Sequence, residues 1–310
     1  MSDYAATGAG HRRTGQNGRM DLGLRDRVYL VTGGSRGLGF AGAQALVADG
    51  ARVVLSAPHE ATASSAAARL AQDAAEADPV AWVVADNADP ATPGRLIGAA
   101  RDRFGRLDGA LISVGGSPPG TLATTTDDAW RSAFESVFLG AVRLARILAT
   151  DLDGRDLDGT DLNGTDLDGT DLSGGDEGRT GTGSLTGTGG SIVFVLASSV
   201  RVPLAELAIS NGLFPGLAGV VKTLAGELGP AGIRVNGVLP VRIATDRVRE
   251  LDALRGDPDE VRARLSQRIP LRRYGEPEEF GRAAAFLLSP AASYITGAMI
   301  PVDGGAISSI

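Results

Sequence analysis

The 310-residue chain contains no cysteine and only two histidines, His11 and His59. The lack of cysteine excludes disulfides and thiolate-bound metals. Two histidines are too few for us to expect a zinc site built on imidazole ligands or a Ser-His-Asp catalytic triad. We therefore predict no metal site.

Long hydrophobic runs are also missing. No stretch of about 18 apolar residues occurs, so no membrane-spanning helix is predicted, and the N-terminus lacks the apolar segment of a signal peptide. Residues 151–190 carry ten acidic side chains and two arginines, which leaves 28 basic and 27 acidic side chains elsewhere. That nearly neutral remainder has no basic patch of the kind that binds nucleic acid. We expect a cytoplasmic protein that binds neither membranes nor nucleic acids.

Two segments differ in composition from the rest. Residues 1–19 are small, polar and without periodicity, so we predict a disordered N-terminal extension before a domain at 20–310. Residues 151–175 are five pentapeptides (DLDGR, DLDGT, DLNGT, DLDGT, DLSGG), and a Gly/Thr/Ser tract follows to residue 190. A calcium-binding repeat would need a nine-residue glycine-aspartate pattern, and five short repeats are few for a solenoid. We predict that 151–190 is an acidic low-complexity insert.

Short apolar runs alternate with longer segments of helical character. The predicted strands are 28–31, 53–55, 80–85, 110–114, 192–196, 235–239 and 299–302, and the predicted helices are 40–49, 62–76, 93–104, 127–149, 207–228 and 277–287. This alternation predicts an α/β fold: a single doubly wound Rossmann domain with a seven-stranded parallel sheet and helices on both faces. Ligands should bind at the carboxyl ends of the strands, and the insert, which joins a helix to a strand, should emerge at the opposite edge.

The segment TGGSRGLG at residues 32–39 joins the first predicted strand to the first predicted helix. Small residues let the backbone approach a pyrophosphate, and the helix N-terminus presents free N–H groups. A dinucleotide site is the prediction.

Together with C-terminal motifs, this segment resembles the short-chain dehydrogenase/reductase family. The motif Thr-Gly-x-x-x-Gly-x-Gly is complete, and IRVNGVLP at 233–240, EPEEF at 276–280 and YITGAMIPVDGG at 294–305 are similar to 3-oxoacyl-(acyl carrier protein) reductases. The resemblance covers about 22–310 apart from the insert. It implies an NAD(P)(H)-dependent oxidoreductase that acts on a carbonyl or hydroxyl group of a small molecule. It also implies a homodimer or homotetramer paired through the helices at 127–149 and 207–228.

The resemblance also implies which residues bind the cofactor. They are Gly33, Ser35, Arg36, Gly37, Leu38 and Gly39 for the pyrophosphate and ribose, Asp86 and Asn87 for the adenine, Val114 and Gly115 after the fourth strand, and Pro240, Ile243 and Thr245 for the nicotinamide. Val114 and Ile243 could equally be core aliphatics. The second strand ends in Ser-Ala-Pro-His at 56–59, without the acidic residue that binds the NAD ribose. With Arg36 in the loop, this favours NADP(H) slightly over NAD(H).

The family's catalytic pair, a tyrosine with a lysine four residues later, is absent. The only lysine is Lys222, and Ala218 stands four residues before it. A tyrosine with its ordinary pKa near 10 is a poor base at neutral pH without a nearby cation. Conventional catalysis is therefore not expected.

Alignment through LAGEL and IRVN places other residues at the catalytic positions. Ser210 takes the tyrosine position, Phe214 the lysine position and Val137 that of a helix asparagine, while Ser199 or its neighbour Ser198 supplies the serine. Two hypotheses remain. The first is an oxidoreductase with altered chemistry, in which Ser199, Ser210, Asn211 or Arg201 polarises the substrate oxygen and water supplies the proton. The second is a pseudoenzyme that binds the dinucleotide and acts as a scaffold, sensor or oligomer subunit.

Overall fold

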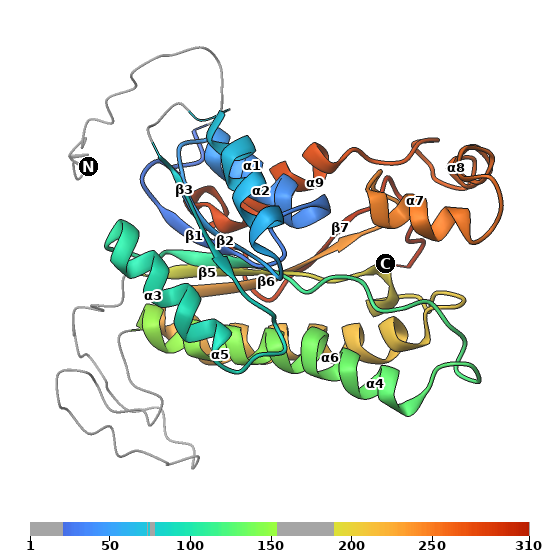
Figure 1. Ribbon diagram of the computed structural model, residues 1–310, viewed down its shortest axis with the longest axis horizontal. Helices are drawn as coiled ribbons and strands as arrows, with labels where there is room; N and C mark the ends of the chain where they lie inside the picture. The colour runs from blue at the N-terminus through green and yellow to red at the C-terminus, as the bar shows by residue number, and fades with distance from the viewer. Residues whose placement is uncertain (1–20, 73, 75–77, 154–188, 310) are drawn as a thin grey trace, which may run out of the picture.

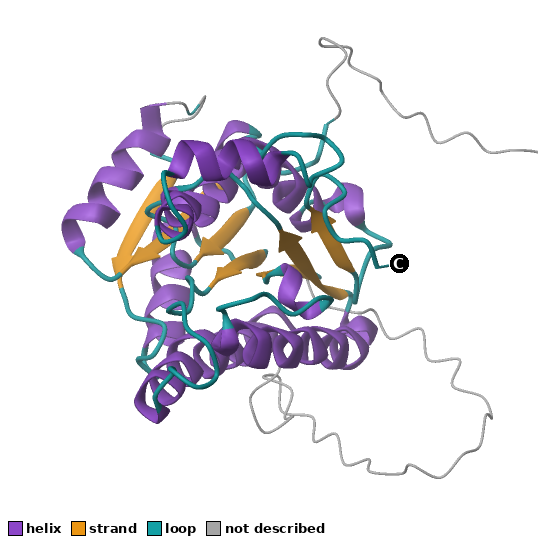
Figure 2. Ribbon diagram, turned by 90° about the vertical axis from the view of Figure 1, so that its right-hand side faces the viewer, coloured by secondary structure: helices purple, strands orange, loops and turns teal. Residues whose placement is uncertain are grey.

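A computed structural model describes residues 21–72, 74, 78–153 and 189–309 of the chain. Seven parallel strands form one sheet in the order β3-β2-β1-β4-β5-β6-β7, with helices on both faces (Figure 2). The strands are β1 Val28–Val31, β2 Arg52–Ala57, β3 Val80–Val84, β4 Gly109–Ser113, β5 Gly190–Val195, β6 Ile233–Pro240 and β7 Met299–Val302. The predicted doubly wound Rossmann fold is confirmed, with the strand order reversing between β1 and β4.

Nine α-helices are described around the sheet. They are α1 Gly37–Ala48, α2 Glu60–Gln72, α3 Thr92–Phe104, α4 Asp127–Ala133, α5 Gly140–Asp153, α6 Ala208–Leu228, α7 Asp246–Ala253, α8 Pro258–Ser266 and α9 Pro277–Leu288. Helices α1, α2 and α9 cover one face, and α3, α5 and α6 cover the other (Figure 1). Because side chains alternate along a strand, Leu30 packs into the core on the α5–α6 side and Val31 into the core on the α1–α9 side.

Two differences from the predicted helices concern the site. The predicted helix 127–149 contains a π-helical segment, Phe134–Leu139, between α4 and α5. Helices α7 and α8, between β6 and β7, were not predicted, because each is short and its sequence is mostly polar. The residues that cap these helices are nevertheless typical of helix starts in a sequence. Thr245 caps α7 and accepts a hydrogen bond from the Val248 N–H, and Asp257 caps α8 and precedes a proline in its first turn.

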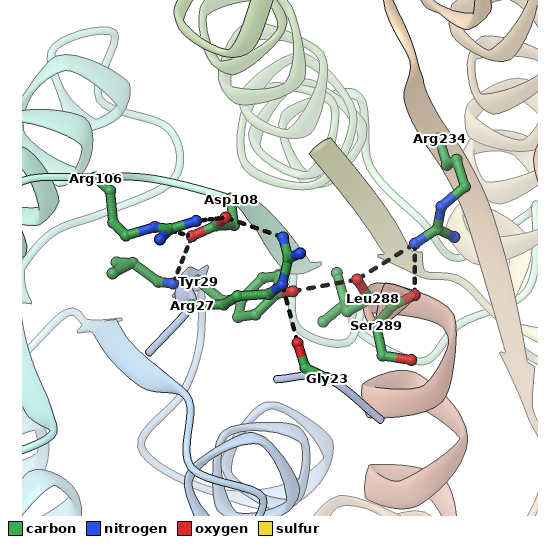
Figure 3. A network of polar contacts seen from close by, with 9 residues as sticks. Gly23, Arg27, Tyr29, Arg106, Asp108, Arg234, Leu288 and Ser289 are labelled. Atoms are coloured by element: carbon green, nitrogen blue, oxygen red, sulfur yellow. Dashed lines mark hydrogen bonds and ion pairs between the residues drawn. The ribbon is translucent and has the colours of Figure 1, made fainter. Parts of the chain in front are cut away.

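A buried carboxylate joins β1 and β4 at the amino ends of the strands (Figure 3). Asp108 accepts hydrogen bonds from Arg27 Nη1 at 3.1 Å, from Arg106 Nη2 at 2.6 Å and from the Val28 N–H at 2.8 Å. Its side chain is only 4% exposed. Hydrogen bonding to Asp108 raises the pKa of the Arg106 guanidinium. The two arginines thus compensate a charge that would be costly to bury alone.

The same edge holds the C-terminus of α9 (Figure 3). Arg234 of β6 donates to the carbonyl oxygens of Leu287 at 2.7 Å and Ser289 at 2.9 Å, and the Tyr29 hydroxyl donates to that of Leu288. These carbonyls have no partner within the helix, so the guanidinium caps it. Burial lowers the pKa of Arg234 and raises that of Tyr29. These contacts give the amino-terminal edge a structural role.

The predicted insert and N-terminal extension lie almost entirely outside the described residues. The flanking elements are described, and they meet at the amino-terminal edge of the sheet. A side-chain carbon on Gly190, which begins β5, would stand 2.6 Å from Leu152 Cδ1 near the end of α5. The two ends of the insert are therefore close enough for a short linker to join them.

Replacing residues 154–188 with a four-residue Gly-Ser linker is expected to keep or raise the melting temperature. Each halving of a flexible loop lowers its closure cost by about 0.6 kcal/mol, so about three halvings would stabilise the fold by roughly 2 kcal/mol. Differential scanning calorimetry measures this directly. A fall of more than about 5 °C would show that the insert packs on the domain and is not a low-complexity loop.

Candidate functional site

The glycine loop between β1 and α1 can accept no side chain at its last glycine. A side-chain carbon on Gly39 would overlap the carbonyl oxygen of Gly33. Gly33 and Gly37 have φ angles of +59° and +56°, in the left-handed region that favours glycine. No side chain caps the N-terminus of α1, because the N-cap residue is Arg36, whose guanidinium has only donor groups and cannot accept from the helix N–H groups. Free N–H groups behind a loop without side chains form a cradle for a phosphate.

The structure brings the loops after β1, β4 and β6 together. Thr32 Oγ1 donates to the Ser113 carbonyl and accepts from the Ser113 N–H, each at 2.9 Å. A side-chain carbon on Gly37 would lie 3.9 Å from Thr245 Cγ2. Gly115 has open space around it. Residues predicted from three separate segments therefore meet where the strand order reverses, which is where α/β sheets bind ligands.

The predicted adenine pair follows β3. Asp86 is exposed, and one of its carboxylate oxygens accepts from the Ala88 N–H at 2.9 Å. Asn87 is half-buried, and its amide has no hydrogen-bond partner among the described residues. The backbone carbonyl oxygen of Asn87 occupies the place that a side-chain carbon on Gly140 would take, so only glycine fits at the start of α5. Both side chains retain polar atoms for a ligand.

The predicted nicotinamide residues divide into two kinds. Pro240 ends β6 and lines the cavity described below. Ile243 is 3% exposed and packs on Gly275, so its side chain belongs to the core, as the alternative interpretation of this residue held. Its carbonyl oxygen accepts the Thr245 N–H at 2.8 Å. Val114 is half-buried against the α5–α6 core.

One buried polar atom at this site lacks a partner. Ser117 Oγ, in the loop after β4, makes no hydrogen bond with any residue that the structure describes. The Ser117 carbonyl accepts from Arg247 Nη2 of α7 at 2.7 Å, which fixes the loop. A buried hydroxyl without a partner costs about 1–3 kcal/mol. Together with the cradle at Gly39, it fits a site that is completed by a bound polar group such as a dinucleotide.

Neither of the two candidate catalytic serines lines the cavity. Ser199 Oγ donates to the Ser210 carbonyl oxygen at 3.2 Å, and both residues are buried. Ser198, the alternative weighed from the sequence, lines the cavity. The other proposed polarising groups are engaged: the Asn211 amide makes two 2.8 Å hydrogen bonds to the Leu204 backbone, and Arg201 Nη2 donates to the Met299 carbonyl. Ser198 is therefore the hydroxyl best placed to meet a substrate.

The remaining catalytic positions have become part of the core. Val137 is 3% exposed and Phe214 is 5% exposed, and both lie in the cluster on the α5–α6 side. The neighbouring helix turns pack tightly: a side-chain carbon on Gly212 would be 2.7 Å from the Trp130 ring, and one on Gly216 would be 2.8 Å from the Phe138 ring. Val137 and Phe214 carry neither an amide nor an ammonium group. Neither residue can therefore supply the positive charge that would lower the pKa of a neighbouring acid.

A cavity of about 730 Å³ lies between the loop after β5, the end of β6 and helices α7 and α8. An ion pair holds α7 against this wall: Arg242 Nη1 lies 2.6 Å from Asp252 Oδ1, and the Tyr274 hydroxyl donates to Asp252 Oδ2 at 2.9 Å. Burial, followed by the bond to Asp252, raises the pKa of Tyr274 to about 12. This cluster could not be recognised from the sequence, because α7 was not predicted.

Tyr274→Phe is expected to lower the free energy of unfolding by about 1–3 kcal/mol at neutral pH, since the hydroxyl binds a charged, buried acceptor. The raised pKa makes this contribution complete below pH 10 and lost as the pH rises towards about 12. Urea unfolding of wild type and variant at pH 7, 9, 10 and 11 measures the difference. A difference that stays constant through pH 11 would contradict this assignment.

Comparison with known proteins agrees with this geometry. Residues 27–159 match the family model described as short chain dehydrogenase, and residues 181–306 match that of enoyl-(acyl carrier protein) reductase. The L-rhamnose 1-dehydrogenase (NAD(P)(+)) of Azotobacter vinelandii is 33% identical over 91% of this chain and 97% of its own. The 3-oxoacyl-[acyl-carrier-protein] reductase of Synechocystis sp. is 31% identical over 92% of this chain and 98% of its own. The chain belongs to the short-chain dehydrogenase/reductase family.

Solved structures of short-chain dehydrogenases/reductases share the fold. L-sorbose reductase from Gluconobacter frateurii, in complex with NADPH and L-sorbose, superposes with a TM-score of 0.78 at 27% identity, over 94% of this chain and 100% of that one. The resemblance stated from the sequence is confirmed. Residues 149–176 additionally match pentapeptide repeats, in eight copies. Within the described residues, no helix is long and apolar enough to cross a membrane, and no three His, Cys, Asp or Glu side chains cluster as metal ligands.

Proposed function

We propose that this short-chain dehydrogenase/reductase binds NADP(H) and reduces a small carbonyl compound without a tyrosine–lysine pair. The observation that carries the proposal is the cradle at Gly39, where any side chain would overlap the Gly33 carbonyl oxygen. A loop so closed to side chains fits the backbone approach that a pyrophosphate requires. The structural neighbour named for its NADPH complex supports a nicotinamide dinucleotide as the ligand.

The choice of NADP(H) rests on charge. The chain at the end of β2 reads Ala57-Pro58-His59, so no acidic residue precedes Glu60, which begins α2. Arg36 is exposed at the glycine loop, and the Arg69 guanidinium of α2 lies 4.2 Å from the Phe40 ring of α1. The two arginines, with no acidic residue between the end of β2 and Glu60, favour a 2′-phosphate.

In the proposed reaction, NADPH when bound supplies the hydride, and the protein supplies orientation. The cradle at Gly39 and Thr245 hold the dinucleotide, while Ser198 donates a hydrogen bond to the substrate carbonyl oxygen. Water delivers the proton, because the described lining of the cavity includes no tyrosine, histidine, lysine or cysteine. A missing positioned acid costs about 10²–10⁴ in rate, so slow turnover is expected.

NADPH fluorescence titration followed by a carbonyl panel (a ketose, a 3-oxoacyl thioester and a cyclic diketone) tests the proposal. We expect saturable binding and slow NADPH oxidation with at least one compound. Ser198→Ala is expected to lower kcat about 10-fold or more with the NADPH affinity unchanged. Turnover equal to wild type in Ser198→Ala would contradict the role given to Ser198, for which Ser199→Ala serves as the neighbouring control.

The alternative is a pseudoenzyme that binds the dinucleotide as a scaffold, sensor or oligomer subunit. The burial of Phe214 and Val137 in the core favours it, since the positions of the lysine and asparagine are closed by packing. NADPH binding without turnover across the panel would support this alternative. Absence of binding would contradict both functions.

A further inference from the structure

The cavity of about 730 Å³ continues the proposed site away from the sheet. Ser198 and Pro240 line it next to the sheet, and α7 and α8 close it on the far side, beyond the carboxyl ends of the strands (Figure 1). The part of a substrate that does not react would therefore lie among α7, α8 and the loop after β5. Helices α7 and α8 thus carry the side chains that would recognise this part.

Much of the wall is apolar. Leu204 and Leu207 come from the loop after β5, and Leu251 and Leu265 come from α7 and α8. Hydrocarbon that packs against these side chains gains free energy because apolar surface is removed from water. The wall therefore suits the hydrocarbon part of a ligand.

Four arginines also line the cavity, and two of them have acidic partners. Arg242 forms the 2.6 Å ion pair with buried Asp252, and Arg255 Nη2 lies 3.6 Å from Glu206 Oε2. Glu206 has a φ angle of +60°, in a region that non-glycine residues rarely adopt. Its backbone is fixed there, because its carbonyl oxygen accepts the Gly120 N–H at 2.7 Å.

The other two arginines have no such partner. The Arg264 and Arg268 side chains make no ion pair or hydrogen bond with any residue that the structure describes, although both line the cavity. Arg264 lies in the last turn of α8, and Arg268 follows two residues after the helix ends at Ser266. A guanidinium matches the geometry of a carboxylate or phosphate, and two of them in the lining of one cavity attract an anion to it.

We propose that the cavity binds a carbonyl compound with an apolar body and an anionic head group, a carboxylate or a phosphate, held by Arg264 and Arg268. This inference rests on the proposed function, because it takes the cavity as the substrate site of that function. Glu206 limits the affinity by neutralising Arg255, so removal of its charge makes a third guanidinium available to the head group.

Isothermal titration calorimetry of 9-oxodecanoate and its methyl ester, with the full chain saturated with NADP+ and without it, tests the inference. The acid is expected to bind about tenfold more tightly than the ester. Arg264→Gln lowers the affinity for the acid about tenfold and leaves the affinity for the ester unchanged. Glu206→Gln raises the affinity for the acid about threefold. Comparison with 8-oxononyl phosphate shows which head group is preferred.

Arg249→Gln is the matched control, because it removes a charge from α7 at a side chain that pairs with Asp259 and does not line the cavity. Equal affinity for acid and ester, or an equal loss in Arg249→Gln, would overturn the inference. Acid-selective binding without NADPH binding would leave the inference standing and contradict the proposed function. NADPH binding and turnover without selectivity for the acid would support the proposed function and overturn the inference about the head group.

Discussion

Gly39→Ala is expected to lower the affinity for NADPH by at least about 100-fold, equivalent to roughly 2.7 kcal/mol. The added carbon would overlap the Gly33 carbonyl oxygen, so the loop must move away from the position that a pyrophosphate needs. Fluorescence titration measures the dissociation constant, and urea unfolding of the same preparation shows whether the variant remains folded.

Gly98→Ala is the matched control for this substitution. Gly98 lies in α3 with no atom within 4 Å of an added carbon, so the variant should bind NADPH as wild type does and be slightly more stable. An unchanged dissociation constant in folded Gly39→Ala would mean that the loop does not hold the cofactor.

Asp108→Asn is expected to lower the free energy of unfolding by about 3 kcal/mol. Removal of one charge from a buried group of this kind costs about 3–5 kcal/mol, and the lower end applies because the Arg27 and Arg106 side chains are 34% and 51% exposed. The NADPH affinity of the folded protein should not change, since Asp108 lies at the amino-terminal edge of the sheet. Urea unfolding at pH 7 measures the difference.

Asp128→Asn provides the comparison, because its ion pair with Arg131 lies on the surface of α4 with 93% of the aspartate side chain exposed. Surface pairs contribute about 0–1 kcal/mol. Equal effects of the two substitutions would show that burial of Asp108 has no energetic consequence, contrary to the network in Figure 3.

The fold was largely predictable because its elements are long and their patterns are distinct. Buried parallel strands read as short apolar runs, and the six predicted helices overlap described ones within a few residues at most ends. The cofactor loops were also predictable, since their glycines answer a local requirement that is visible in the sequence. The contact between Gly37 and Thr245 could not be predicted from local sequence, because it depends on the order of the strands in the sheet.

The substrate side of the site was not predictable in the same way. Arg264 lies in a short polar helix without apolar periodicity, and Arg268 lies just after it. Their relation to Ser198 depends on how α7 and α8 fold back over β6. The choice between Ser198 and Ser199 depends on which of two adjacent hydroxyls turns to the cavity. Only the absence of a Tyr-x-x-x-Lys sequence could be established without coordinates, and the burial of Phe214 supplies its structural counterpart.

Hydride transfer at the dinucleotide site without a tyrosine–lysine pair can be followed with NADPH dideuterated at C4. The measurement is mass spectrometry of the products formed from the carbonyl panel and 9-oxodecanoate. We expect at least one product to gain a single deuterium at the carbonyl carbon, with wild type and Gly98→Ala but not with Gly39→Ala. No deuterium above the protein-free level in any product, from protein that binds NADPH, would contradict it.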